Sequence, residues 1–422
     1  MPMIQLRPNE VLTGTEVGIQ ISGFKGHSEV LLTSSRIYSA KYYQSTARFR
    51  ANANGIIHIK EDSPISGSYL KADSWGPFWS MEEIESESTP RNQKPDYVYF
   101  YCESNDGLNA EATLKLISIA PEITRSEVRD DGLVGVCFLP NGEGPFPAVI
   151  IVGGSGGGLS ESAAAYWASQ GYVALALAYF ALGNLPPYLK EIPLEYFGKA
   201  IQWLQNRGIV DAKKIGIIGV SRGGELALLL ASYYPEIKAV LARTPSHVCW
   251  GAVVPESEKH LAGAWTWNGR VIPYVHYLSS KCEYKPIGEN EKAVFSVPAF
   301  NASLEQFSEQ ISDAEIPIER IKAPILFIAG LDDQIWPASF FIERARERLI
   351  RYNHSYPNEF LIYENAGHVF SFPGDPAPEP YFFHPITKEW IALGGSREGC
   401  ARAGLDSLIK AKRFLREHLM EG

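Results

Sequence analysis

Two patterns of hydrophobic and polar positions divide the chain. In about the first 120 residues, short stretches alternate apolar and polar side chains, as at 17–21, 57–59 and 114–116. A period of two is typical of half-buried antiparallel strands. Turn residues such as Asn54-Gly55 separate these stretches, and no helix-length apolar stripe appears. The pattern predicts a small all-β sandwich domain over residues 1–125.

From about residue 135 onward, the apolar positions form continuous runs, which are typical of strands buried on both faces. The runs are 147–152, 172–177, 215–220, 238–241, 324–329 and 360–363. Helix-like stretches alternate with them: one capped by Ser160, then 194–204, 225–231, 338–349 and 405–419. Strands that alternate with helices predict a doubly wound, mostly parallel sheet over residues 126–422, which makes the fold class α/β.

This alternation stops between residues 244 and 320, where prolines and scattered aromatic residues take its place. An insertion of that length in a compact domain is usually a lid or a pocket wall. The insertion is therefore the segment that we expect to border a functional site.

The first domain contains an acidic stretch at 82–87. We interpret it as a solvated loop rather than a binding site.

A serine in the second domain has the setting of a nucleophile. Residues 219–223 read Gly-Val-Ser-Arg-Gly, follow an apolar run and precede a helix-forming stretch. This is the G-x-S-x-G pattern in its required strand–turn–helix context, in which the turn holds the serine oxygen above the sheet. The helix N-terminus behind it stabilises developing negative charge. We predict that Ser221 is a nucleophile rather than a residue that only caps the helix.

A nucleophilic serine needs a base, and the base needs an acid that orients it. The apolar run at 324–329 leads into Gly330-Leu331-Asp332-Asp333, so two aspartates compete for the role of the acid. We favour Asp333, which lies three residues after Gly330 and three before Trp336, and interpret Asp332 as a turn residue. The next run ends before Gly367-His368, where the base belongs in the order Ser, Asp, His. His247 and His276, in the insertion, are the nearest rivals of His368 for a role in the pocket.

The glycine-rich stretch at 153–158 follows the first buried run of the second domain. It matches neither the dinucleotide pattern G-x-G-x-x-G nor the phosphate-binding pattern that ends in Gly-Lys. We interpret it as the loop that supplies an oxyanion-hole amide, with Ser155 as the donor and the backbone N–H of Arg222 as its partner.

Composition narrows the function classes further. Lys and Arg number 39 against 48 Asp and Glu, so the net charge is −9 and nucleic acid is not expected as a partner. No apolar run approaches the length of a membrane span. The five cysteines are widely spaced without a CxxC, so we expect neither a disulfide framework nor a zinc site, and no other metal or cofactor is implied. The first residues show no leader pattern, and we expect a cytoplasmic protein.

Several of these stretches resemble the acyl-CoA thioesterase and bile acid-CoA:amino acid N-acyltransferase family. In the second domain they are 144–147, 154–159, 175–179, 194–197, 219–226, 330–333, Trp336 and 367–368. In the first domain they are Gly67-Ser68-Tyr69 and the Trp-Gly-Pro-Phe-Trp-Ser-Met of 75–81. The resemblance covers nearly the whole chain and implies an α/β-hydrolase fold behind an N-terminal β domain.

The resemblance also implies an activity. Members of this family hydrolyse acyl-CoA thioesters, or pass the acyl group to glycine or taurine, through a serine or cysteine nucleophile. The nucleophile, acid and base then fall on Ser221, Asp333 and His368. Cysteine is associated with the conjugating branch, so Ser221 favours hydrolysis. The alternatives are an N-acyltransferase, a carboxylesterase or peptidase on the same triad, and a binding protein with a vestigial triad.

Overall fold

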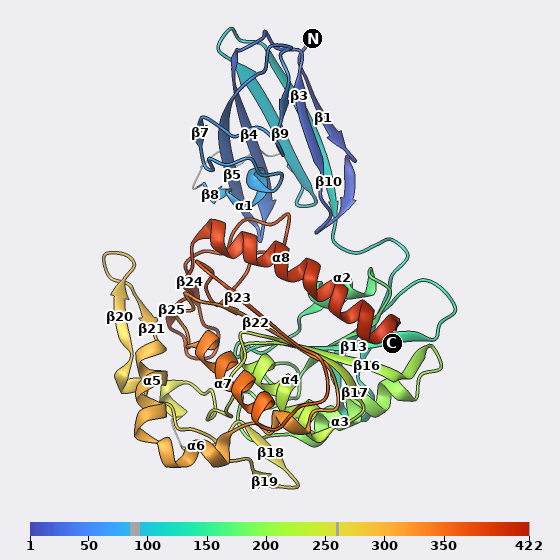
Figure 1. Cartoon of the computed structure of the whole chain (residues 1–422), viewed down its shortest axis with the longest axis vertical. Helices are drawn as coiled ribbons and strands as arrows, with labels where there is room; N and C mark the ends of the chain where they lie inside the picture. The colour runs from blue at the N-terminus through green and yellow to red at the C-terminus, as the bar shows by residue number, and fades with distance from the viewer. Residues whose placement is uncertain (85–92, 259–260, 422) are drawn as a thin grey trace. The chain divides into compact units, whose positions relative to one another are not determined.

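The computed structural model has two units, one built from strands and the other from alternating strands and helices (Figure 1). It describes residues 1–84, 93–258 and 261–421. The first unit comprises residues 1–120, 370–378 and 400–405, and the second comprises 121–369, 379–399 and 406–422. The division of the sequence at 125/126 remains our proposal for the domain boundary.

The first unit has two antiparallel-rich sheets, as the period-two pattern predicts. The smaller sheet has the order β1 (Met3–Arg7), β3 (Gly18–Ser22), β6 (Ile57–His58). The larger has the order β2 (Glu10–Leu12), β10 (Asn109–Ile117), β9 (Tyr97–Ser104), β4 (Glu29–Tyr38), β5 (Lys41–Arg50), β7 (Ser66–Gly67), with β8 (Glu82–Glu83) also on β5. Ile21 from one sheet and Phe49 and Leu114 from the other are fully buried in one shared core. This confirms the predicted sandwich, which also holds the short helix α1 (Gly76–Trp79).

The acidic stretch only partly matches its interpretation as a loop. Glu82 and Glu83 are exposed but pair with β5 as a short strand, and Glu83 forms an ion pair with Lys41 (2.7 Å). Ile84 follows this short strand. The rest of the acidic stretch, 85–87, lies outside the described residues.

The second unit is built on one large sheet, and its order confirms the predicted α/β class. The order is β11 (Thr124–Val128), β12 (Val134–Leu139), β14 (Val173–Ala178), β13 (Phe146–Val152), β16 (Val210–Val220), β17 (Ile237–Arg243), β22 (Ile325–Gly330), β23 (Asn358–Tyr363). The strands from β14 to β23 run parallel, whereas β11 and β12 are antiparallel. Because the carboxyl ends of parallel strands share an edge, the loops after β13, β16, β22 and β23 meet there.

Helices cover both faces of this sheet. They are α2 (Glu161–Ala168), α3 (Leu194–Gln205), α4 (Arg222–Tyr233), α7 (Ala338–Arg351) and α8 (Arg397–Leu415), which ends in a π-helical turn (Arg416–Met420). Figure 1 shows α2 and α8 on one side of the sheet and α3 and α4 on the other. Among the described helices, none is both long enough and apolar enough to cross a membrane. This arrangement is that of an α/β-hydrolase.

Two details of the helices differ from the sequence-based expectation. Ser160 precedes α2 as expected, but its side chain forms no capping hydrogen bond. The last helix begins at Arg397 rather than at 405, because Ser396 caps it by accepting a hydrogen bond from the backbone N–H of Gly399 (3.0 Å). Its first turn, 397–400, contains two charged residues and a glycine, so the apolar stripe starts later than the helix.

The insertion forms small elements that pair with other parts of the second unit. They are β18 (Trp265–Trp267), β19 (Arg270–Val271), β20 (Glu283–Pro286), β21 (Lys292–Phe295), α5 (Val297–Gln306) and α6 (Ser308–Ala314). β18 pairs with β15 (Ile192–Pro193), and β21 pairs with β25 (Trp390–Ala392), which pairs with β24 (Tyr381–Phe383). The described part of the insertion is therefore joined to the unit by strand pairing.

Two segments from late in the chain belong to the first unit by their contacts, 370–378 and 400–405. Arg36 on β4 fixes the first of them. Its guanidinium donates to the carbonyl of Gly374 (2.7 Å) and pairs with Asp375 (3.0 Å). Burial raises the pKa of Asp375, so this ion pair is needed to keep the buried carboxylate charged.

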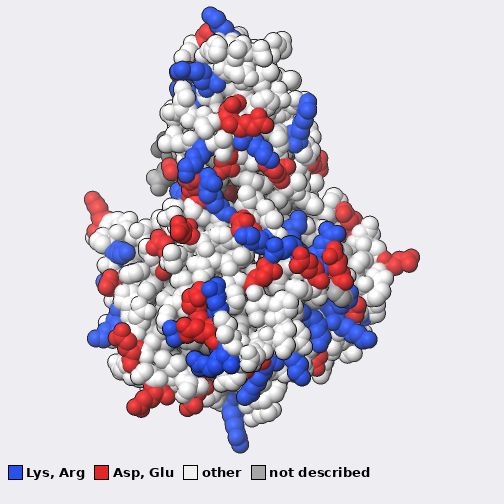
Figure 2. Space-filling model, viewed as in Figure 1, with Lys and Arg blue, Asp and Glu red and all other residues white. Residues whose placement is uncertain are grey.

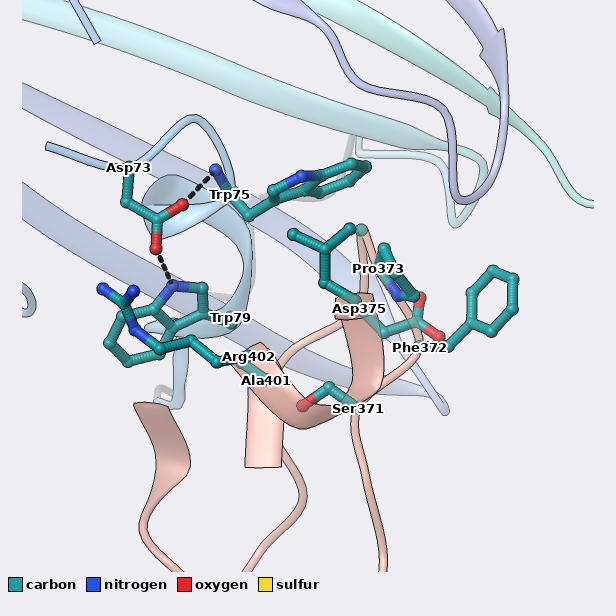
Figure 3. Close-up of a pocket in the computed structure, with 11 residues that line it drawn as sticks. Asp73, Trp75, Trp79, Ser371, Phe372, Pro373, Asp375, Ala401 and Arg402 are labelled. Atoms are coloured by element: carbon teal, nitrogen blue, oxygen red, sulfur yellow. Dashed lines mark hydrogen bonds between the residues drawn. The ribbon is translucent and has the colours of Figure 1, made fainter. Parts of the chain in front are cut away.

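A small cavity in the first unit lies beside these segments (Figure 3). Trp75 and Trp79 line it together with Ser371 and Ala401, and its volume is about 20 Å³. Asp73 orients the two tryptophans, because its carboxylate accepts from Trp75 N (2.8 Å) and Trp79 Nε1 (3.0 Å). A cavity of this size accommodates about one water molecule and no substrate.

Charged side chains of both signs are interspersed on the face that Figure 2 shows. Exposed ion pairs of the described residues include Lys115–Glu10 (2.9 Å) and Arg344–Glu347 (3.0 Å). Such pairs contribute at most about 1 kcal/mol each. On this face the net charge of −9 is not gathered into a single patch.

Candidate active site

Ser221 lies at the sharp turn between the end of β16 and the start of α4. Its φ is 57° and its ψ is −123°, a left-handed conformation that costs a residue with a side chain about 1–3 kcal/mol. The neighbours hold it there. Ser221 N donates to the carbonyl of Arg243 (2.8 Å), and Ser221 O accepts from the N–H of Glu225 (3.0 Å). A strained serine at this position is the nucleophile-elbow geometry.

The turn requires glycine on both sides of Ser221. A Cβ on Gly219 would lie 1.9 Å from the carbonyl oxygen of Gly223, and one on Gly223 would lie 2.3 Å from that of Gly153. A Cβ on Gly154 would lie 3.3 Å from the Cβ of Ser221. The glycine-rich loop after β13 therefore packs directly against the elbow.

His368 and Asp333 form a buried pair in the loops that follow β23 and β22. His368 Nδ1 lies 2.7 Å from Asp333 Oδ2, and their side chains are 5% and 2% exposed. The other carboxylate oxygen, Oδ1, accepts from the N–H groups of Ile335 (2.9 Å) and Trp336 (3.2 Å). Because the carboxylate accepts from Nδ1–H, the neutral imidazole keeps its lone pair on Nε2. That is the tautomer a general base needs.

The two candidate aspartates point in different directions. Asp332 is exposed, and its carboxylate accepts from the backbone N–H of Gly395 (2.9 Å). The structure thus pairs Asp333, and not Asp332, with His368. Asp332 instead ties its own turn to the loop before α8, which agrees with its interpretation as a turn residue.

The remaining predicted site residues surround the elbow. Arg222 is the first residue of α4, so its N–H is one of those that a helix leaves without an internal partner. Ser155 lies in the glycine-rich loop, with its Oγ 3.0 Å from Nε2 of His384. Among the described residues, the side chain of Ser221 forms no hydrogen bond with His368. Such bonds commonly tighten only when substrate binds.

Family models match both parts of the chain. Residues 192–421 match the BAAT/acyl-CoA thioester hydrolase C-terminal model, and residues 14–130 match the acyl-CoA thioester hydrolase/BAAT N-terminal region. The chain belongs to the BAAT/acyl-CoA thioester hydrolase family. This confirms the resemblance seen in the sequence.

Relatives in this family match over nearly their whole length. Human acyl-coenzyme A thioesterase 6 is 28% identical over 95% of this chain and 93% of its own. Human acyl-coenzyme A thioesterase 1 is 27% identical over 96% of this chain and 93% of its own length. Mouse acyl-coenzyme A amino acid N-acyltransferase 1 is 27% identical over 98% and 97%. The family thus includes proteins named for hydrolysis and a protein named for acyl transfer.

In this family member, the side chain of Arg222 points away from Ser221 and into the unit. Its guanidinium donates to the carbonyl of Trp250 (2.9 Å) and lies 3.3 Å from Glu225. Glu225 is fully buried and also accepts from Nε1 of Trp265 (2.7 Å). Burial raises the pKa of Glu225, and the guanidinium opposes that rise. The network anchors the insertion to the first turn of α4 and leaves the backbone N–H of Arg222 to the site.

Aromatic side chains connect the insertion to the catalytic histidine candidate. Phe300 on α5 packs against Trp250 (4.6 Å between ring centroids) and Trp336 (5.6 Å). Trp336 in turn packs edge-on against His368 (6.0 Å). The insertion is therefore linked to His368 through the ring contacts of Phe300 and Trp336. Its role as a lid or pocket wall stays a prediction.

The rival histidines lie elsewhere in the insertion. His247 is buried against Phe341 (5.2 Å), and His276 packs between Tyr274 (4.9 Å) and Phe307 (5.2 Å). Among the described residues, neither forms a hydrogen bond or ion pair with Ser221 or Asp333. Both are therefore packing residues of the insertion.

His247 leads to a prediction about stability. Burial, with Arg344 and Arg348 nearby, lowers the pKa of His247 from 6.5 to about 3. Below pH 6.5 the unfolded chain takes up a proton at this residue and the native state does not. The free energy of unfolding therefore decreases as the pH is lowered. We expect His247 to cost about 2 kcal/mol at about pH 5 relative to about pH 7.5. Urea unfolding at both values should show that His247→Leu loses this part of the pH dependence. An unchanged pH dependence in the variant would contradict the prediction.

Two buried groups were missed by the sequence analysis, Glu225 and His384. Glu225 is an acidic residue directly before the apolar stretch 226–231 of α4, and the sequence alone could have drawn attention to it. His384 follows the aromatic residues of β24 and matches no motif. Within the described ranges, no group of three or more His, Cys, Asp and Glu is arranged to hold a metal ion.

Proposed function

We propose that this protein is an acyl-CoA thioesterase that uses Ser221, His368 and Asp333 as a catalytic triad. The observation that carries the proposal is the buried His368–Asp333 pair (2.7 Å) at the same sheet edge as the strained Ser221. Relatives named acyl-coenzyme A thioesterases, which match over more than nine-tenths of their length, support the substrate class.

The geometry accounts for acylation. Ser221 Oγ attacks the thioester carbonyl carbon while Nε2 of His368 removes the hydroxyl proton. The imidazolium that forms is stabilised by the carboxylate of Asp333. When the tetrahedral intermediate collapses, the C–S bond breaks, the CoA thiolate leaves and the acyl group remains as an ester on Ser221. The proton on His368 passes to the thiolate or to solvent, so the base is neutral again.

Deacylation repeats the same proton transfers with water. His368 removes a proton from a water molecule as the oxygen attacks the acyl-enzyme, and returns it to Ser221 Oγ as the ester bond breaks. In both steps the carbonyl oxygen carries a negative charge. We propose that the N–H groups of Arg222 and Ser155 bind this oxyanion. In such sites one donor typically lowers the activation free energy by about 3 kcal/mol.

Transfer of the acyl group to an amine is the second candidate, because one relative is named an amino acid N-acyltransferase. The nucleophile distinguishes the two reactions. An acyl-serine is an oxygen ester, which amines attack less readily relative to water than they attack the thioester of an acyl-cysteine. Ser221 therefore supports hydrolysis.

A panel of acyl-CoA substrates with detection of the released thiol tests the proposal. We expect stoichiometric release of CoA and free acid, with no amide product when glycine or taurine is added. Amide formation would show an acyltransferase. Turnover of p-nitrophenyl esters with no reaction on any acyl-CoA would show an esterase, and binding of acyl-CoA without acylation of Ser221 would show a vestigial triad.

Acyl-CoA is accordingly the partner that we propose, and no cofactor takes part in the reaction as written. A cytoplasmic location stays a prediction, since the relatives include proteins named mitochondrial and peroxisomal.

A further inference from the structure

A second serine–histidine pair lies beside the elbow and is not used by the proposed triad. Ser155 Oγ lies 3.0 Å from Nε2 of His384, and both residues belong to the second unit. His384 is 2% exposed and follows β24. Ser155 lies in the glycine-rich loop, directly after Gly154, which packs against Ser221. The pair thus connects a buried histidine to the candidate oxyanion loop.

The backbone around His384 determines which ring nitrogen carries the proton. Nδ1 faces the N–H groups of Ile386 and Thr387, each at 3.2 Å. A nitrogen that faces two donors must accept, so in the neutral ring the proton is on Nε2. Burial lowers the pKa of His384 to about 4, which keeps the ring neutral near neutral pH. Nε2–H therefore donates to Ser155 Oγ.

This direction of the hydrogen bond has a consequence for Ser155. A hydroxyl has one proton, and here its oxygen accepts from the histidine, so the proton is available to another acceptor. The oxygen is fixed in place, because the turn that carries His384 is closed by two backbone bonds, His384 N to Glu389 O (2.8 Å) and Lys388 N to His384 O (3.0 Å). The histidine can therefore set the rotamer of Ser155 rather than follow it.

The residue after His384 packs on the same loop. A Cβ on Gly156 would lie 3.4 Å from Cγ of Pro385, so the proline ring lies in ordinary contact distance of that glycine. The loop at 153–158 thus contacts two parts of the unit. Gly154 packs against the elbow, and Ser155 and Gly156 contact the 384–385 turn. A glycine-rich backbone has many accessible conformations, and this packing restricts them.

We propose that His384 is a positioning residue for the oxyanion hole: it holds Ser155 so that the loop presents its N–H, and the free proton of the Ser155 hydroxyl, to the carbonyl oxygen under attack. The inference rests on the proposed function in one respect, since it needs Ser221 to be the nucleophile. It does not depend on the acyl donor being a CoA thioester.

Two substitutions separate positioning from a structural role. In His384→Asn, the side-chain oxygen can replace Nδ1 as acceptor for Ile386 and Thr387, but the side chain is too short to reach Ser155. In His384→Gln, the longer side chain can bring an N–H close to the former place of Nε2. We expect kcat to fall about 10- to 100-fold in His384→Asn with KM changed little, and to recover most of the wild-type value in His384→Gln. Ser155→Ala should cost about as much as His384→Asn, and adding His384→Asn to it should cost little more.

Three readouts make the outcome decisive: hydrolysis of acyl-CoA, hydrolysis of p-nitrophenyl acetate, and the rate at which a fluorophosphonate labels Ser221. Urea midpoints of all variants serve as the check on folding, and Ser155→Ala tests the inference if His384→Asn does not fold. The inference is overturned if His384→Asn and His384→Gln have the same kcat on reactive substrates. It is also overturned if the kcat losses of Ser155→Ala and His384→Asn multiply in the double variant. Either result leaves the proposed function untouched. If acyl-CoA is not hydrolysed but the ester and the label show the Asn–Gln difference, the inference holds and the thioesterase proposal fails. A wild-type protein that hydrolyses neither acyl-CoA nor the ester and does not take up the label overturns both.

Discussion

Ser221→Ala is expected to abolish turnover of acyl-CoA, with a loss of about 10⁶ in kcat, the size seen when a triad nucleophile is removed. The alanine lacks the oxygen that would form the acyl-enzyme. The fold should survive, because the backbone bonds from Ser221 to Arg243 and Glu225 do not involve the side chain. The left-handed φ of 57° is also as accessible to alanine as to serine.

The measurement has two parts. Thiol release gives kcat, and the intact mass after mixing with acyl-CoA shows whether an acyl adduct forms and where it maps. Ser232→Ala is a matched control on the same helix, since its hydroxyl donates to the carbonyl of Leu229 (2.7 Å) at the opposite end of α4. Wild type and the control should carry one adduct on Ser221. An adduct on a cysteine, or full activity in Ser221→Ala, would show that the nucleophile is another residue.

The central parallel strands could be predicted because buried strands have no polar face. The runs at 147–152 and 324–329 correspond to β13 and β22 within one or two residues. The strands β11 and β12 were missed. β12 is nearly as buried as its neighbour β14, but Gly135 interrupts its apolar run. β11 is an edge strand with the exposed residues Arg125 and Glu127. Charged side chains are common on edge strands, where they discourage pairing with another chain, and they weaken the hydrophobic pattern.

The candidate site was predictable for a different reason. Ser221, Asp333 and His368 each follow a strong apolar run and have a glycine nearby, so local sequence is enough to locate them at one sheet edge. The Arg222–Glu225 network and the Ser155–His384 pair join residues far apart in the sequence, 229 positions in the second case. Their partners are chosen by tertiary packing of the insertion and of the 384–389 turn. No local pattern carries that information.

Asp333→Asn should cost about 10⁴ in kcat while leaving the fold intact. The amide oxygen of the asparagine can still accept from the N–H groups of Ile335 and Trp336, as Oδ1 of the aspartate does (2.9 and 3.2 Å). Its NH₂ group then faces Nδ1 of His368, where the aspartate presents a carboxylate oxygen (2.7 Å). Two donors cannot face each other, so Nδ1 loses its proton and Nε2 gains it. A protonated Nε2 cannot accept the proton of Ser221.

Asp332→Asn is the matched control, one residue away and chemically identical. Its carboxylate is exposed and accepts from the N–H of Gly395 (2.9 Å), a bond that an amide oxygen can keep. We expect kcat to stay within about tenfold of wild type, since the change does not alter the tautomer of His368. Urea unfolding of both variants should show similar midpoints, because each asparagine preserves the backbone contacts of the aspartate it replaces. Steady-state kcat on the acyl-CoA that the panel identifies as preferred then compares the two sites directly. If Asp332→Asn is the slower variant, the acid is Asp332, and the pairing of His368 with Asp333 has only a structural role.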